Sequence, residues 1–183
     1  MNKFLKTFLE ALQIFLFALA IVIPIRYFLF QPFFVSGASM EPNFESGEYL
    51  LIDEISYRFR EPQRGEVIVF KYPKDPSTLF IKRIIGLPGE TIEINDGKVI
   101  IYNLEFPEGK VLEEPYLKDT TTEGSVKVSL AKNEYFVLGD NRNHSSDSRS
   151  WGPVPRENII GRAWISVFPL KGIEVLTTPS YSF

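Results

Sequence analysis

The sequence predicts a mostly β protein, an antiparallel β domain preceded by one N-terminal transmembrane helix. The first 35 residues hold much of the apolar excess of the chain. Beyond them the sequence changes to short apolar runs separated by Gly, Pro and Asn, a pattern typical of strands joined by turns. No later stretch keeps a helical apolar period for more than a turn or two, so we expect only short helical turns there.

The N-terminal segment is predicted to be a membrane anchor. Between Glu10 and Arg26 lie 15 uncharged residues, whereas a membrane span needs about 20 predominantly apolar ones. Residues 4–8 and 27–30 extend the apolar stretch on its two sides, and the Arg26 side chain can reach a membrane interface. We therefore assign residues 1–31 to a cytoplasmic tip and transmembrane anchor.

Two other interpretations of this segment are weaker. In a cleaved secretory signal, Ser36-Gly37-Ala38 would be the small-x-small cleavage site. The bulky residues 33–35 directly before it and the long apolar region argue against that reading. A buried core helix would need a larger partner domain than this chain offers.

The charges beside the anchor predict its orientation. Lys3 and Lys6 precede the span, which favours a cytoplasmic N-terminus, although Arg26 on the far side weakens the bias. Residues 177–183 are too short and polar for a second span. We therefore expect a single-pass protein of a plasma membrane or an organelle membrane of bacterial descent. Residues 32–183 are expected to form an extracytoplasmic β domain.

Within this domain, six apolar runs predict strands, and Asn95-Asp96-Gly97 predicts a hairpin turn between the third and the fourth. Residues 103–133 are the least patterned and are expected to form a small extended ribbon or insertion without a second core. The six predicted strands are residues 48–53, 66–71, 91–94, 98–102, 134–138 and 163–168.

Composition excludes several classes of function. A net charge of −3 and the absence of a basic stripe give no support to a nucleic-acid partner. Because the chain has no cysteine, thiol catalysis, disulfides and Cys-ligated zinc are excluded. A single histidine also argues against a transition-metal site, so we expect no metal and no cofactor.

Two segments carry the residues of a serine nucleophile and a lysine base. Ser39 lies in a turn beside Gly37, whose backbone freedom can present a hydroxyl to a substrate. Lys82 lies among Phe80, Ile81, Ile84 and Ile85. Desolvation disfavours an ammonium ion and lowers its pKa, so such an amine can act as a base near neutral pH. Each residue alone is more often an ordinary turn serine or a solvated strand lysine.

A polar loop, residues 139–149, follows a strong predicted strand and contains the lone histidine, His144. A triad of Ser39 and His144 with Asp140 or Asp147 is formally possible. A lone histidine in so polar a loop is more often solvated, and we therefore favour the lysine as the base.

Four ordered motifs resemble the motif boxes of bacterial type I signal peptidases. The similarity runs from the anchor to Pro153. The motifs are Ser36-Gly37-Ala38-Ser39-Met40-Glu41-Pro42, residues 64–70, residues 80–89, and residues 139–149 with their Gly-Asp-Asn-Arg and Ser-Ser-Asp-Ser-Arg parts.

The resemblance implies a membrane-bound serine endopeptidase that removes signal peptides from secreted preproteins after small residues of the Ala-x-Ala type. Ser39 would be the nucleophile and Lys82 the general base. The expected partners are preproteins, membrane lipid and a nearby secretion translocase. The supporting residues would be Ser145, which orients the Lys82 amine, and two ion pairs, Asp140 with Arg83 and Asp147 with Arg149.

The resemblance also implies shallow pockets for small substrate side chains. Some family members carry a hydroxyl two residues before the nucleophile, where this chain has Gly37. Stabilisation of the oxyanion would then rest on the backbone N–H of Ser39, with Ser36 or a water as possible helpers. The residues expected to line the substrate site are Phe33, Gly37, Met40, Leu50, Val69, Phe80 and Ile81.

Two alternatives differ in class. A self-cleaving Ser/Lys protease of the SOS-repressor type shares the dyad but would be soluble, which the apolar N-terminal segment contradicts. A non-enzymatic membrane-anchored scaffold would be expected to lack Ser39 or Lys82, and both are present.

Overall fold

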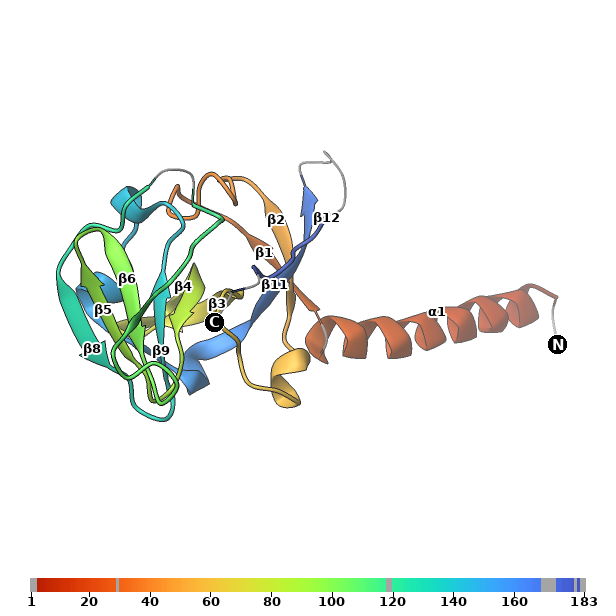
Figure 1. Ribbon diagram of the computed structural model, residues 1–183. Helices are drawn as coiled ribbons and strands as arrows, with labels where there is room; N and C mark the ends of the chain where they lie inside the picture. The colour runs from red at the N-terminus through yellow and green to blue at the C-terminus, as the bar shows by residue number, and fades with distance from the viewer. Residues whose placement is uncertain (1–2, 29, 118–119, 169–173, 180, 182–183) are drawn as a thin grey trace.

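The computed structural model describes residues 3–28, 30–117, 120–168, 174–179 and 181, and the side chains of residues 23–30 lie outside this description. Helix α1 (Lys3–Phe28) projects as a single rod from a β body (Figure 1). Its segment Lys3–Val22 is long and apolar enough to cross a membrane, and none of it is buried against the body. A helix that is apolar on all sides and unburied requires an apolar solvent. The predicted apolar N-terminal helix is therefore present, while the placement of Arg26 at an interface concerns a side chain outside the description.

The main sheet is antiparallel and contains eight strands in the order β1-β2-β11-β3-β4-β9-β10, with β12 added beside β11. The strands are β1 (Phe30–Phe34), β2 (Tyr49–Asp53), β3 (Val67–Tyr72), β4 (Asp75–Gly86), β9 (Glu134–Leu138), β10 (Val154–Pro155), β11 (Ile159–Phe168) and β12 (Glu174–Val175).

Both faces of the main sheet are buried at its centre. In β3, Val67 and Val69 pack into one apolar cluster, whereas Ile68 and Phe70 pack into another. Alternate residues of a strand point to opposite faces, so a strand covered on both sides reads as the continuous apolar run seen in the sequence. Lys82 of β4 pairs with Ile68 in the register of the two strands.

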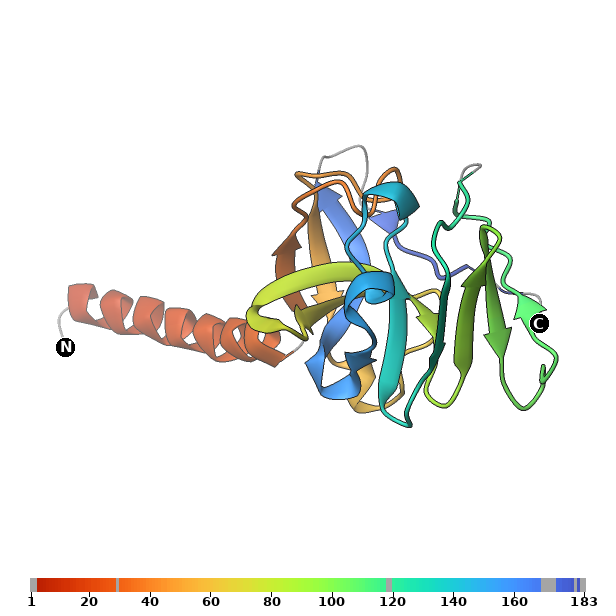
Figure 2. The same ribbon diagram turned by 90° about the vertical axis from the view of Figure 1, so that its left-hand side faces the viewer.

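A second antiparallel sheet, with strand order β7-β6-β5-β8, lies on the side of the main sheet away from α1 (Figure 2). The predicted hairpin is confirmed: Asp96 and Gly97 have φ of 49° and 75° between the paired strands, as a two-residue turn of this kind requires. Its strands are β5 (Thr91–Asn95), β6 (Lys98–Tyr102), β7 (Lys110–Val111) and β8 (Val126–Ser129).

The second sheet has an apolar core, which differs from the ribbon expected for residues 103–133. Leu112 and Leu130 come from that region and pack with Ile92 and Ile101 of β5 and β6. The apolar residues of the region are too widely spaced to show a period, and their packing partners lie before it in the chain. The unit therefore begins with β5, before residue 103.

Short helical turns complete the body, as expected. They are η1 (Ser56–Arg58), η2 (Arg142–His144), α2 (Ser148–Trp151) and η3 (Arg156–Asn158). Two of them, η2 and α2, belong to the polar loop after β9. Local hydrogen bonds therefore order this loop, such as the bond of 2.9 Å from the backbone N–H of Ser150 to the Asp147 carbonyl.

Candidate active site

Ser39 lies in the turn that follows β1. Gly37 opens the turn with φ of +93°, a conformation that side-chain-bearing residues rarely adopt. Met40 and Phe44 are buried in the core of the main sheet and fix the turn from below. The backbone N–H of Phe44 also donates to the Met40 carbonyl, at 3.0 Å. The turn thus presents the hydroxyl of Ser39, and the residue after it, Met40, is anchored in the core.

The amine of Lys82 meets that hydroxyl. Lys82 Nζ lies 2.7 Å from Ser39 Oγ and 2.8 Å from the carbonyl oxygen of Ile81. The lysine is 4% exposed, and its Nζ lies 5.4 Å from the centre of the Phe80 ring. Burial lowers the pKa of Lys82 to about 8, although the charges of Asp147 and Asp140 act in the opposite direction. The arrangement pairs a hydroxyl with an amine that can be neutral near physiological pH.

A surface cavity of about 380 Å³ opens over these two residues. Its walls include Phe33, Gly37, Phe80 and Ile81, four of the seven residues expected at the substrate site. The complete lining is Phe33, Phe34, Ser36, Gly37, Ala38, Ser39, Leu79, Phe80, Ile81, Lys82, His144 and Ser146.

The other three expected residues do not line the cavity. Met40, Leu50 and Val69 are at most 1% exposed and belong to the core of the main sheet. Leu50 and Val69 lie on the inward face of their strands, a consequence of strand register that the sequence pattern left open. They support the cavity from behind instead of contacting its contents.

Two arginine–aspartate pairs flank the lysine. Arg83 Nε and Nη2 contact Asp140 Oδ1 and Oδ2 at 2.8 and 2.5 Å, and both side chains are buried. Arg149 Nε contacts Asp147 Oδ1 at 2.8 Å, and Asp147 Oδ2 accepts the backbone N–H of Gly139 at 3.1 Å. The structure thus brings together both expected pairs: the first joins the lysine strand to the polar loop, and the second lies within the loop.

Ser145 differs from expectation. Its Oγ is buried and has no hydrogen-bond partner among the described residues. The Lys82 amine is instead held by Ser39 and by the Ile81 carbonyl. Ser145 packs against Gly139, where an added Cβ would lie 2.2 Å from Ser145 Oγ and 2.4 Å from the carbonyl oxygen of Ser39. The polar loop therefore approaches the nucleophile turn as closely as a glycine allows.

Asn141 was not singled out from the sequence, yet it joins the loop to the nucleophile turn. Its backbone N–H donates to the Ser39 carbonyl at 3.1 Å, and its Nδ2 donates to the Ala38 carbonyl at 3.0 Å. An asparagine in a polar loop gives no sequence signal for this role. His144 is exposed, and its Nδ1 lies 3.2 Å from Asn141 Oδ1. With Asp140 and Asp147 bound to arginines, the geometry gives no support to a histidine triad.

Comparisons with known proteins show the family of the chain. The model of the family "Signal peptidase, peptidase S26" matches residues 8–168. The chain belongs to the S26 family of signal peptidases. It is 38% identical to a probable signal peptidase I-2 of Synechocystis, over 94% of this chain and 78% of that protein. It is also 38% identical to signal peptidase I of Leptolyngbya laminosa, over 90% and 82% of the two chains. A crystal structure of a signal peptidase I from Enterococcus faecalis shares 32% identity, covering 56% of this chain and 97% of that one with a TM-score of 0.48.

Signal peptidases are hydrolases that cleave the signal peptides of preproteins, so the substrate class expected from the motifs is confirmed. If Lys82 is the base, the protonation state of its amine controls the rate of cleavage.

We expect cleavage by this signal peptidase to rise with pH through a single limb at the Lys82 pKa of about 8. Below that pH the amine is protonated and cannot accept the Ser39 proton, so kcat should fall about tenfold per pH unit. The measurement is kcat for a preprotein over a range of pH. A limb at the ordinary lysine pKa of 10.5 would contradict a desolvated base, and one near about 6.5 would indicate His144.

Substitution of Gly139→Ala should lower kcat by about 10- to 100-fold, because the added methyl group would displace the Ser39 carbonyl or Ser145. Asn143→Ala, at an exposed position of the same loop, is the matched control and should retain wild-type kcat. Equal rates for the two variants would show that the close approach of loop and turn is unimportant.

Proposed function

We propose that this signal peptidase cleaves preproteins with Ser39 as nucleophile and Lys82 as general base. The observation that carries the proposal is the 2.7 Å contact between Lys82 Nζ and Ser39 Oγ, made by a buried lysine. The neutral amine accepts the Ser39 proton as Oγ attacks the scissile carbonyl carbon. The resulting ammonium protonates the leaving amine, and water then hydrolyses the acyl-enzyme.

Oxyanion stabilisation is assigned to the nucleophile turn. The backbone N–H of Gly37 already donates to Ser46 Oγ at 3.2 Å, and that of Glu41 donates to the Ala38 carbonyl at 3.2 Å. The Ser39 N–H is the donor attached to the nucleophile itself, and Ser36 lines the cavity as a second candidate. One such donor contributes on the order of 3 kcal/mol to catalysis where a site is built around it.

The cavity supports specificity for small side chains before the cleaved bond. Its apolar walls, Phe33, Phe80 and Ile81, are backed by the close-packed core of the main sheet. Such a core yields little to a larger side chain. Alanine at the first and third positions before the bond fits these walls, whereas bulky residues would clash with them.

The supporting residues are assigned to positioning. Asp140 with Arg83 fixes the loop that carries Ser145 against the lysine strand, and Asp147 with Arg149 holds the loop's own conformation. Ser145 Oγ is a buried hydroxyl with no hydrogen-bond partner among the described residues, and it is available to an amine that moves during the reaction. It would then orient Lys82 in a step of catalysis, instead of in the resting enzyme.

We assign residues 1–31 to a single membrane anchor with a cytoplasmic N-terminus, and residues 32–183 to an extracytoplasmic catalytic domain. Half-exposed aromatic rings of Phe34, Tyr49 and Phe168 form a row whose neighbouring centroids are 5.0 and 6.3 Å apart. Aromatic rings favour the headgroup region of a bilayer. They support contact of this face with the outer leaflet of the plasma membrane, close to the translocase from which preproteins emerge.

The dyad is tested by cleavage of a purified preprotein that ends its signal in Ala-x-Ala, with the full chain in detergent. Wild type should cut after the second alanine, and Ser39→Ala and Lys82→Ala should each lower kcat by at least about 10³-fold. His144→Ala is the control and should keep near wild-type activity. Activity that survives Lys82→Ala would place the base elsewhere. Replacement of the last alanine of the signal by Phe should abolish cleavage.

The orientation is tested by adding protease to sealed membrane vesicles that contain the full chain with an N-terminal tag. In right-side-out vesicles the β domain should be digested and the tag protected, because residues 32–183 face outward. Inverted vesicles should give the reverse pattern. Digestion of the domain only in inverted vesicles would refute the proposed topology.

A further inference from the structure

Residues 112–117 and 120–122, here called the bridging segment, lie between β7 and β8 and contact Asn43, Arg83 and Arg142 around the proposed dyad. Both ends are fixed to the second sheet: the N–H of Leu112 donates to the Val99 carbonyl at 2.8 Å, and that of Thr122 donates to the Gly97 carbonyl at 3.0 Å. Between these ends, Glu114 and Tyr116 reach toward the main sheet. The segment is therefore held by one sheet while its side chains contact residues of the other.

Glu114 binds the most deeply buried arginine of the described residues. Arg142 is 1% exposed, and its Nη1 contacts Glu114 Oε2 at 2.9 Å while its Nη2 contacts Glu114 Oε1. Its Nη1 also reaches Thr122 Oγ1, and its Nε donates to the Gly139 carbonyl at 3.0 Å. Burial would lower the pKa of Arg142, but the hydrogen bonds and charge of Glu114 raise it, so the guanidinium stays charged. Through Arg142, the forked pair ties the bridging segment to Gly139, the first residue of the polar loop.

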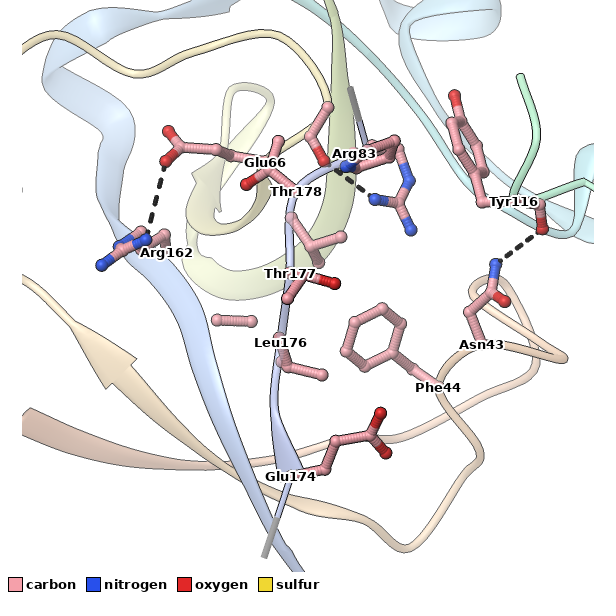
Figure 3. Close-up of a pocket in the computed structure, with 14 residues that line it drawn as sticks. Asn43, Phe44, Glu66, Arg83, Tyr116, Arg162, Glu174, Leu176, Thr177 and Thr178 are labelled. Atoms are coloured by element: carbon pink, nitrogen blue, oxygen red, sulfur yellow. Dashed lines mark hydrogen bonds and ion pairs between the residues drawn. The ribbon is translucent and has the colours of Figure 1, made fainter. Parts of the chain in front are cut away.

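Tyr116 contacts the other two motifs. Its ring lies 4.1 Å from the guanidinium carbon of Arg83, the residue that follows Lys82 in the chain. Its carbonyl accepts Nδ2 of Asn43 at 3.1 Å, and the same Nδ2 lies 2.9 Å from Asp140 Oδ2. Figure 3 shows Asn43 bonded to Tyr116 beside Arg83, at the edge of a cavity of about 190 Å³ that is lined by strands of the main sheet and by residues 176–179. Tyr116 thus lies where the nucleophile turn, the lysine strand and the polar loop meet.

We propose that Glu114 and Tyr116 are positioning residues of the peptidase, and that the bridging segment sets the distance between Ser39 and Lys82. The proposal rests on the proposed dyad. Glu114 lies outside the substrate cavity, so it acts through Arg142 and the Gly139 carbonyl. Gly139 in turn lies against the Ser39 carbonyl. Loss of the Glu114 charge would leave Arg142 buried without its carboxylate, and the loop would move to relieve it.

The test compares Glu114→Gln with Glu108→Gln, an exposed glutamate of the same region, in the full chain in detergent. All rates are measured well below the melting temperature of the least stable variant. Glu114→Gln should lower kcat by about 10- to 100-fold with KM changed less than about twofold, because it misplaces reacting groups without touching substrate. Glu108→Gln should match wild type. A wild-type kcat for Glu114→Gln, or a loss confined to KM, would overturn the proposal.

A double variant separates positioning from stability. Glu114→Leu with Arg142→Met removes both charges and should restore the melting temperature toward wild type, since apolar pairs often replace buried ion pairs without loss. Because it also lacks the bond to Gly139, its kcat should stay at least about tenfold low. Recovery of wild-type kcat would show that Glu114 serves stability alone.

Ser39→Ala, assayed in the same series, distinguishes the two levels of inference. If Ser39→Ala still cleaves the preprotein, the proposed dyad is wrong, whatever the result at Glu114. If Ser39→Ala is inactive and Glu114→Gln is fully active, the dyad stands and the positioning role of the bridging segment is refuted.

Discussion

The burial of a single amine, that of Lys82, is the constraint on which the rest of the site depends. An ammonium ion at a position that is 4% exposed is costly, and this cost is what lowers its pKa to about 8. The apolar neighbours of Lys82 therefore contribute to the chemistry as well as to the core. A base of this kind needs no histidine, but it does need walls that keep water away from Nζ.

Two carboxylates lie close enough to Lys82 to favour the protonated form of its amine. Asp140 and Asp147 both raise the pKa of Lys82, and a direct ion pair with either would hold the amine in its protonated form. The arginines prevent it: Arg83 binds both oxygens of Asp140, and Arg149 binds Asp147. Each pair neutralises a carboxylate while fixing the loop that closes the site. In the proposed mechanism the same residues therefore tune the pKa of the base and position it.

The sequence revealed the parts of this site whose signal is local. Ser39 follows a glycine in a short turn, Lys82 lies in an apolar run, and the two ion pairs lie within ordered motifs. Residues whose roles depend on register or on distant partners were missed or misplaced. The resemblance placed Val69 at the substrate site, and a run that is apolar on both faces gave no strand parity against which to check that placement. Asn141 and Glu114 make their contacts 103 and 28 residues away, which no local pattern encodes.

The second sheet looks like an accessory in the sequence, yet its core packs against two strands that carry the site. This core includes Ile85 of β4, the strand of Lys82, and Leu138 of β9, the strand that leads into the polar loop. Removing the sheet would expose both strands to water on that side. The strands that hold Lys82 and the loop therefore depend on packing well outside the catalytic motifs. It follows that the second sheet can vary at its exposed turns, whereas its apolar face and the bridging segment are tied to the chemistry.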